Sequence, residues 1–186
     1  APAIAARSFH AQARTLLGAG PSAPIGTVCL FVDEFTDRYE PELGLAAVEL
    51  LHAGGYRVLA PELGPSGRTY LSKGYVRDAR DHIERNIATL DGLLDDVDAI
   101  VGIEPSAVLT MLDEACDLPQ AVTLRARARE IAAKVALVQD FVARAATAGR
   151  WQAQWTDASA KVLLHGHCHQ KAQVGVGLTQ QALALP

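Results

Sequence analysis

Thr27-Val28-Cys29-Leu30-Phe31-Val32 is a short segment in which five apolar side chains follow one threonine without a polar break. Such a continuous run is typical of a strand that is buried on both faces of a parallel sheet. Similar runs occur at residues 56–60 and 98–103, and helical patterns lie between them at 41–52 and 71–94. Because strands alternate with helices, the sequence predicts an α/β fold, a Rossmann-like parallel sheet flanked by helices.

The chain divides into three segments, of which only the middle one is expected to be a complete unit. Residues 1–24 are predicted to form an N-terminal helix and a linker, and residues 25–160 a complete α/β half. Residues 161–186 are predicted to begin a second half, with a fourth strand at 161–164 followed by a loop and a helix. The stretch 120–148 is rich in Ala and Arg and predicts a helical segment, broken at most once.

Composition and charge limit the classes of function. The chain has 186 residues, of which 49% are hydrophobic and 20% charged, as in a globular protein with a substantial core. A formal net charge of −4 argues against a general electrostatic grip on nucleic acid or anionic lipid. No apolar run approaches the ~20 residues of a membrane helix, so no transmembrane segment is expected.

Cysteine is sparse in this sequence. Cys29, Cys116 and Cys168 are the three cysteines, and no two of them form a Cys-x-x-Cys pair. Such a set is not a disulfide framework, and it suits the reducing environment of the cytoplasm. Cys29 lies inside an apolar run and is expected to be a packed thiol. Acidic neighbours should raise the pKa of Cys116, so a reactive thiolate is not expected there.

Four unusual loops follow the four predicted strands, at 33–40, 62–68, 104–106 and 165–170. Ligands of open parallel sheets bind at the carboxyl ends of the strands. The sequence therefore predicts that these loops meet at one edge of the sheet and form a site there.

The most distinctive of these loops is His165-Gly166-His167-Cys168-His169-Gln170-Lys171. Imidazole and thiolate groups are the usual ligands of zinc and other transition metals. On an extended chain, His165, His167 and His169 point to one side and Cys168 to the other, so one metal ion needs a turn to reach all four. A metal or cluster site and a plain hydrogen-bonded loop of histidines both remain open.

The other loops also allow two interpretations. Pro65-Ser66-Gly67-Arg68 lies between a strand and a helix, where its amides and guanidinium can hold an anion or simply form a turn. Asp33-Glu34, with Asp37 nearby, is either a pair of carboxylates that acts in acid/base chemistry or binds a cation, or a solvated loop. Glu104 ends a buried strand and can cap the next helix or belong to a site.

Four ordered motifs carry a resemblance to a known family. They lie at residues 30–44, 66–74, 101–106 and 165–172, within a region spanning residues 25–175. Together they resemble the cysteine-rich CCG domain of FAD-linked oxidases and iron–sulfur oxidoreductases. That family includes the iron–sulfur subunit of glycolate oxidase and a heterodisulfide reductase subunit. The similarity looks closest to the C-terminal part of fused D-lactate or D-2-hydroxyglutarate dehydrogenases.

The resemblance implies an electron-transfer module of a flavin-linked 2-hydroxy-acid dehydrogenase. In that family, cysteine thiolates hold a [4Fe-4S] cluster that passes electrons from a reduced flavin to an acceptor. FAD would then be bound in another domain or chain, and that flavin-binding domain or subunit would be the partner. The implied location is the cytoplasm, with peripheral attachment at the inner face of the membrane through the parent complex as a further option.

The sequence departs from the family at the positions equivalent to the cluster ligands. Pro65-Ser66-Gly67 replaces Cys-Cys-Gly, and Pro105-Ser106-Ala107 replaces Pro-Ser-Cys. Glu104 takes the first position of that Cys-x-x-Cys motif, Asp33 or Glu34 stands where the first cysteine is expected, and only Cys168 matches.

We therefore expect that the chain alone assembles no four-cysteine cluster and contains no complete active site. The cluster-equivalent loops keep a set of candidate binding residues: Asp33, Pro65, Ser66, Gly67, Arg68, Glu104 and Ser106. Two alternatives remain. One is a non-redox α/β module that binds a ligand or docks a subunit. The other is a single zinc site built from His165, His167, Cys168 and His169.

Overall fold

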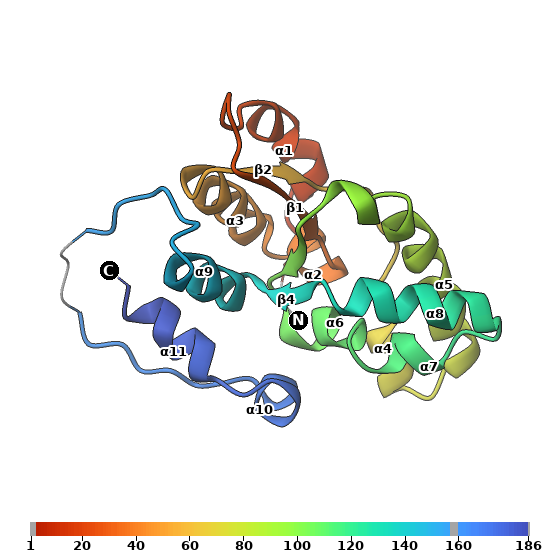
Figure 1. The fold of residues 1–186 in the computed structure, drawn as a ribbon. Coiled ribbons are helices and arrows are strands. Elements are labelled where there is room, and N and C mark those ends of the chain that lie inside the picture. The colour runs from red at the N-terminus through yellow and green to blue at the C-terminus, as the bar shows by residue number, and fades with distance from the viewer. Residues whose placement is uncertain (1–2, 157–159, 186) are drawn as a thin grey trace.

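The computed structural model describes residues 3–156 and 160–185 and has an α/β architecture. Its sheet has four parallel strands in the order β2-β1-β3-β4 (Figure 1). The strands are β1 (Gly26–Phe31), β2 (Tyr56–Leu59), β3 (Ala99–Gly102) and β4 (Val135–Leu137). The α-helices are α1 (Phe9–Gly18), α2 (Glu34–Arg38), α3 (Pro41–Ala53), α4 (Arg68–Ser72), α5 (Val76–Asp91), α6 (Pro105–Thr110), α7 (Glu114–Asp117), α8 (Val122–Ala132), α9 (Val138–Thr147), α10 (Cys168–Gln173) and α11 (Gly177–Leu183). A 3₁₀ turn, η1, covers Leu94–Asp96. The predicted α/β fold with a parallel sheet is confirmed.

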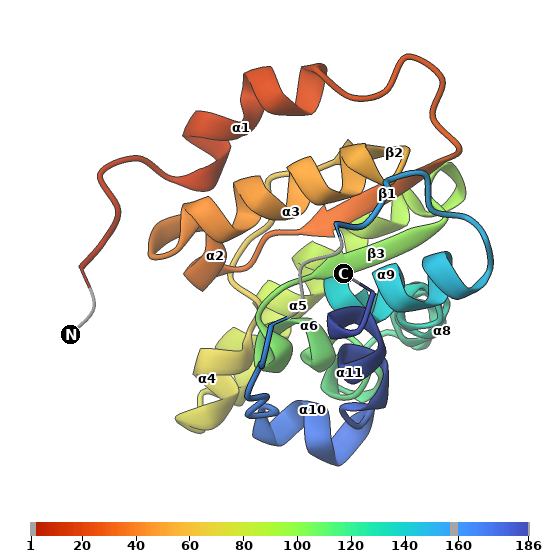
Figure 2. The same ribbon diagram turned by 90° about the vertical axis from the view of Figure 1, so that its left-hand side faces the viewer.

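Strand β1 explains how the core is divided, because its side chains alternate between the two faces of the sheet. Cys29 and Phe31 pack with α5, α6 and α8, whereas Val28 and Leu30 pack with α1, α3 and α9. Figure 2 shows α1 and α3 on one side of the sheet and α5 and α6 on the other. Burial on both faces is the reason that residues 27–32 carry no polar alternation.

The fourth strand is not where the sequence predicted it. β4 lies within the stretch 120–148, which was expected to be helical, and it pairs with β3 through Ile100 and Val135. Three residues between two helices are too few to show a strand periodicity, so the pattern of the flanking helices hides β4. Residues 161–164 form no strand and are exposed, and Leu163 is fully accessible.

Several predicted helices differ in extent from the observed ones. The N-terminal helix begins at Phe9, where the Ser8 hydroxyl caps it by accepting from the Ala11 amide, rather than at residue 2. The loop 33–40 contains α2, and the predicted helix 71–94 is two helices, α4 and α5. Residues 168–183, expected to be a loop and one helix, form α10 and α11, which pack against α6 and α9. No helix within the described residues has the length and apolar character that a membrane crossing needs.

Candidate functional site

The loops after β1 and β2 are joined by the carboxylate of Glu34. Its Oε2 accepts a hydrogen bond from the Ser66 amide at 2.8 Å, and its Oε1 accepts one from the Ser66 hydroxyl at 3.1 Å. Ser66 is fully buried, so these bonds satisfy polar groups that water cannot reach. Gly67 follows with a φ of +87°, a conformation that favours glycine and turns the chain into α4. We name this contact between Glu34 and Ser66 the loop clasp.

The loop clasp also explains why the anion-binding site predicted at residues 65–68 is occupied by the protein itself: the expected donors already bind its own carboxylates. The Ser66 amide, one of the expected donors, already binds the Glu34 carboxylate. Arg68, the expected cationic donor, forms an ion pair with Glu114 across to α7. In this conformation, Pro65-Ser66-Gly67-Arg68 is an internally satisfied β-to-α turn.

Asp33 has a capping role in the structure. Its side chain is 1% exposed and accepts hydrogen bonds from the Phe35 amide at 2.8 Å, the Thr36 amide at 3.1 Å and the Thr36 hydroxyl at 2.7 Å. Burial raises the pKa of Asp33, and these hydrogen bonds only partly oppose the rise. Asp33 therefore fixes the start of α2, and the neighbouring Glu34 reaches the next loop.

Glu104 combines the two roles that the sequence left open. Its Oε2 accepts from the Ser106 hydroxyl and the Ala107 amide, both at 2.7 Å, and so caps α6. Its Oε1 lies 3.8 Å from Nε2 of His167. The loop after β3 therefore meets the histidine loop, as the prediction of a shared edge requires.

The histidine loop is not extended but turns into helix α10, so Cys168 does not point away from the neighbouring histidines. His167 caps α10, and Cys168 is the first residue of that helix. As a result, one ligand atom from each of His167, Cys168 and His169 lies within 4.8 Å of the others. His165 is exposed and stands outside this group. The structure thus gathers three of the four predicted metal ligands, which we name the His–Cys–His turn.

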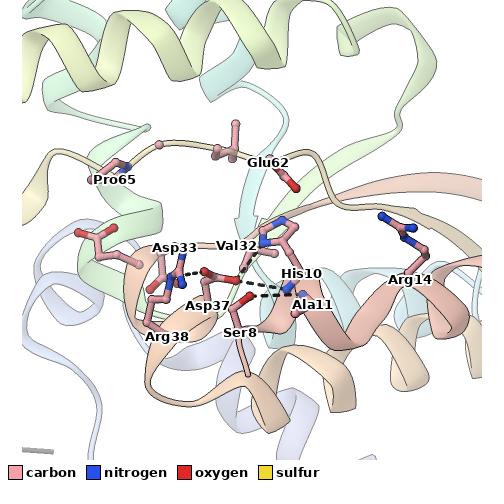
Figure 3. A pocket seen from close by; sticks show the side chains of 13 residues that line it. Ser8, His10, Ala11, Arg14, Val32, Asp33, Asp37, Arg38, Glu62 and Pro65 are labelled. Carbon is pink, nitrogen blue, oxygen red and sulfur yellow. Dashed lines mark hydrogen bonds and ion pairs between the residues drawn. The ribbon is translucent and has the colours of Figure 1, made fainter. Parts of the chain in front are cut away.

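A second polar feature, which the sequence analysis missed, lies between α1 and the ends of β1 and β2. It is a cavity of about 490 Å³, and Figure 3 shows side chains of α1, the loop after β1 and the loop after β2 around it. Its lining includes His10, Arg14, Asp37, Arg38 and Glu62. His10 stands on the polar side of a helix that was expected to lie outside the α/β unit, so no sequence signal linked it to Asp37.

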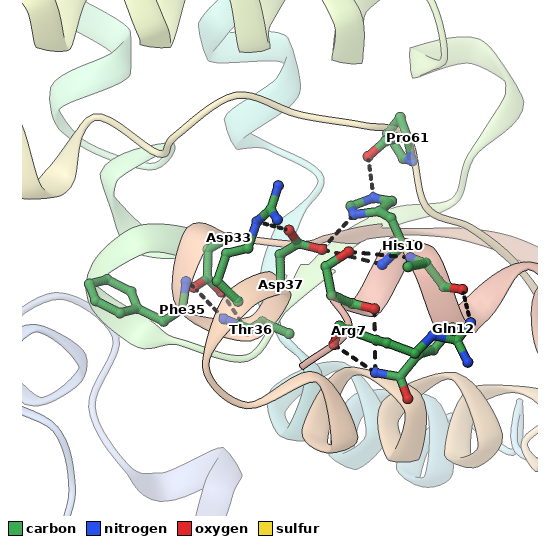
Figure 4. Close-up of polar contacts among 11 residues, drawn as sticks. Arg7, His10, Gln12, Asp33, Phe35, Thr36, Asp37 and Pro61 are labelled. Carbon is green, nitrogen blue, oxygen red and sulfur yellow. Dashed lines mark hydrogen bonds and ion pairs between the residues drawn. The ribbon is translucent and has the colours of Figure 1, made fainter. Parts of the chain in front are cut away.

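His10 and Asp37 form the polar centre of this cavity (Figure 4). Nδ1 of His10 lies 2.9 Å from Oδ1 of Asp37, and Nε2 lies 3.3 Å from the Pro61 carbonyl. Burial by itself would raise the pKa of Asp37, but the hydrogen bonds from the side chain and backbone of His10 outweigh it, so the pKa is lowered.

Replacing His10 by Ala should therefore lower the free energy of unfolding at neutral pH and make that free energy depend less on pH in acid. A carboxyl whose folded-state pKa is lowered stabilises the fold above its unfolded-state pKa, and that contribution disappears as the pH falls through the folded value. We expect a loss of about 1–2 kcal/mol at pH 7 and a smaller difference from the wild type at pH 2–3. Urea unfolding at both pH values tests this, and an equal loss at both would contradict it.

The cysteines do not fit a four-thiolate cluster. Cys29 is buried in β1, and burial raises its pKa to about 12. Cys116 lies in α7, where burial raises its pKa; Arg129 opposes the rise and nearby acidic groups add to it, so the predicted direction is confirmed. Within the described chain, Cys168 is grouped with two histidines and with no other thiol. A cluster held by this chain's own cysteines is thus incompatible with their positions.

Thiol reactivity should follow these environments. In the native protein, we expect a thiol-specific reagent at pH 8 to modify the exposed Cys168 first, at least about 100-fold faster than the buried Cys29. Denaturation should make all three cysteines accessible to the reagent. Mass spectrometry of the labelled peptides measures the order, and early labelling of Cys29 would contradict the burial described here.

The fold and the site define an α/β protein of Rossmann-like architecture in which the loops after β1 and β2 meet at the carboxyl edge of a parallel sheet and the loop after β3 meets the histidine loop. Comparison with protein-family models, with curated proteins and with solved structures finds no match to this chain.

Proposed function

We propose that the chain is a degenerate electron-transfer module, of the CCG type, from a flavin-linked 2-hydroxy-acid dehydrogenase. The observation that supports this proposal is that the four motif loops contact one another in two pairs. Glu34 of the first motif binds Ser66 of the second, and Glu104 of the third faces His167 of the fourth. Contacts between motifs are expected if the four motifs descend from one ligand-binding site.

The module is degenerate because carboxylates and hydroxyls stand where thiolates are needed. Glu34 and Ser66 hydrogen-bond the loops after β1 and β2 to each other, and Glu104 caps its own helix α6 through Ser106 and Ala107. Hard oxygen ligands are poor substitutes for the soft thiolates that hold iron and sulfide. The chain by itself is therefore expected to have no dehydrogenase turnover, and the flavin belongs to a partner domain or subunit.

Isolation of the native protein from its source tests this function. Protein tagged in its natural gene should co-purify with FAD, either on the same polypeptide or on a bound subunit. That preparation should reduce a dye with D-lactate or D-2-hydroxyglutarate, whereas the isolated chain should not. Native protein that is free of flavin and inactive with both acids would overturn the proposal.

A further inference from the structure

We propose that the His–Cys–His turn and Glu104 form a binding site for one zinc ion. The four candidate ligands are the imidazoles of His167 and His169, the thiolate of Cys168 and Oε1 of Glu104. Two nitrogens, one sulfur and one oxygen are a borderline-soft set, which zinc accepts and which calcium and magnesium avoid. This site is independent of the proposed electron-transfer role and requires no flavin partner.

The distances within the His–Cys–His turn are within reach of those of a tetrahedral site. Ligand atoms bound about 2.1 Å from a tetrahedral ion lie roughly 3.4 Å apart. The atoms of the His–Cys–His turn lie within 4.8 Å of one another, and Oε1 of Glu104 lies 3.8 Å from Nε2 of His167. Side-chain rotations can bring the three atoms of the His–Cys–His turn together around an ion. Glu104 is not among the residues whose ligand atoms all lie within 4.8 Å of one another, so its side chain must move further to complete the site.

The backbone that carries the turn is fixed from the inner side. The Gln170 side chain is buried and donates to the Thr179 hydroxyl at 2.6 Å, and that hydroxyl donates to Asp140 of α9 at 3.2 Å. Gly166 lies so close to the start of α11 that a Cβ there would stand 2.4 Å from Cγ1 of Val176, the residue before that helix. Ligands carried by a fixed backbone lose little conformational entropy when the ion binds.

Glu104 is already oriented for this role. Its Oε2 is held by the Ser106 hydroxyl and the Ala107 amide, which leaves Oε1 directed toward His167. Carboxylates that bind metals are commonly fixed by such hydrogen bonds. The helix cap and the metal ligand are then two oxygens of one carboxylate.

Zinc binding would break one hydrogen bond of His167 and could satisfy a buried nitrogen of His169. Nδ1 of His167 accepts a long hydrogen bond, 3.3 Å, from the His169 amide, and zinc on Nε2 would move the ring proton to Nδ1 and break that bond. Nδ1 of His169, in turn, is buried and has no hydrogen-bond partner among the residues that the structure describes. A zinc ion bound through Nδ1 of His169 would satisfy this buried nitrogen, and that gain would offset the loss of the bond to His167.

Zinc titration of chelator-treated protein purified without a His-tag column tests the site. We expect one zinc per chain, competition against a chromophoric chelator that gives a Kd below about 1 μM, and protection of Cys168 from the thiol reagent. Cobalt in place of zinc should give the near-ultraviolet absorption of a thiolate–cobalt bond. Cys168→Ser, His167→Ala and His169→Ala should each weaken binding by about 100-fold or more, and Glu104→Gln, which keeps a capping oxygen, by about 10-fold.

His165→Ala is the matched control, because His165 is in the same loop but outside the cluster. It should bind zinc as the wild type does. Circular dichroism should confirm that each variant remains folded. Folded wild-type protein that binds no zinc, or zinc binding that survives Cys168→Ser, would overturn the proposal, and so would a His165→Ala variant that loses zinc as the other histidine variants do. None of these outcomes bears on the flavin test of the proposed function.

Discussion

Cysteines at Pro65, Ser66, Glu104 and Ala107 should turn the chain into one that holds an iron–sulfur cluster. After anaerobic reconstitution with iron and sulfide, we expect the fourfold variant to bind about four irons and four sulfides per chain, the content of one [4Fe–4S] cluster. Broad visible absorbance should accompany the uptake. The wild type, treated in the same way, should bind less than about a tenth of that amount, because its three thiols do not converge.

The expectation rests on the proposed function, in which the scaffold of the two loops is kept while the ligand atoms have changed. Helix α4, which follows Ser66, packs against α6, which begins just after Glu104. Ser66 and Ala107 are both fully buried; at Ser66, cysteine only replaces oxygen by the larger sulfur, and at Ala107 it adds a sulfur atom. Removing Glu104 costs the cap of α6, about 1 kcal/mol, which is small beside the stabilisation that a bound cluster supplies.

Two half-restored variants are the control. P65C/S66C and E104C/A107C each supply two new thiols from one loop, and neither should hold a cluster, because four ligands are needed. If the fourfold variant is folded but takes up no iron, or if a half-restored variant equals it, the two loops do not form a common ligand site. The resemblance would then describe the sequence motifs without their shared geometry.

The sequence predicted the parts of the fold that depend on local pattern. Residues 27–32 identify a doubly buried strand because both faces of β1 are covered, by α3 on one side and α5 on the other. The sequence did not predict β4, because this strand is stabilised by pairing with β3 and is too short to show a periodic pattern. Residues 161–164 show the reverse: their apolar pattern predicts a strand, but within the described chain no strand pairs with them. Local pattern cannot reveal whether a pairing partner exists.

The candidate site was predictable only where the motifs themselves carry the contact. The sequence predicted that the loops of Glu104 and His167 meet, and they do, but the strand at 161–164 from which the position of the histidine loop was argued is absent. The turn that brings Cys168 to the same side as its neighbours depends on helix α10, which the alternation of an extended chain does not reveal. His10 and Asp37 are 27 residues apart and meet only because α1 packs beside the loop after β1. Such a contact depends on tertiary packing, so sequence spacing alone gives no sign of it.

Replacing Glu34 by Ala should lower the free energy of unfolding by about 2–3 kcal/mol, because it opens the loop clasp. The change leaves the amide and hydroxyl of the buried Ser66 without the acceptors that they have at 2.8 and 3.1 Å. An unsatisfied buried donor costs its full desolvation penalty, which exceeds the net value of an ordinary hydrogen bond. Glu34→Gln keeps one acceptor oxygen and should give an intermediate loss.

Glu49→Ala is the matched control, since Glu49 is an exposed carboxylate on α3, and it should change stability by no more than about 0.5 kcal/mol. Urea unfolding measures all three variants, and a double-mutant cycle with Ser66→Ala separates the clasp from general effects. With Ser66→Ala already in place, Glu34→Ala should lower the free energy of unfolding by clearly less, because there is no Ser66 hydroxyl left without an acceptor. A Glu34→Ala variant as stable as Glu49→Ala would mean that the two loops are held together by their packing alone. Each loop would then be free to move without the other, and the edge of the sheet would lose the fixed geometry that a shared ligand site requires.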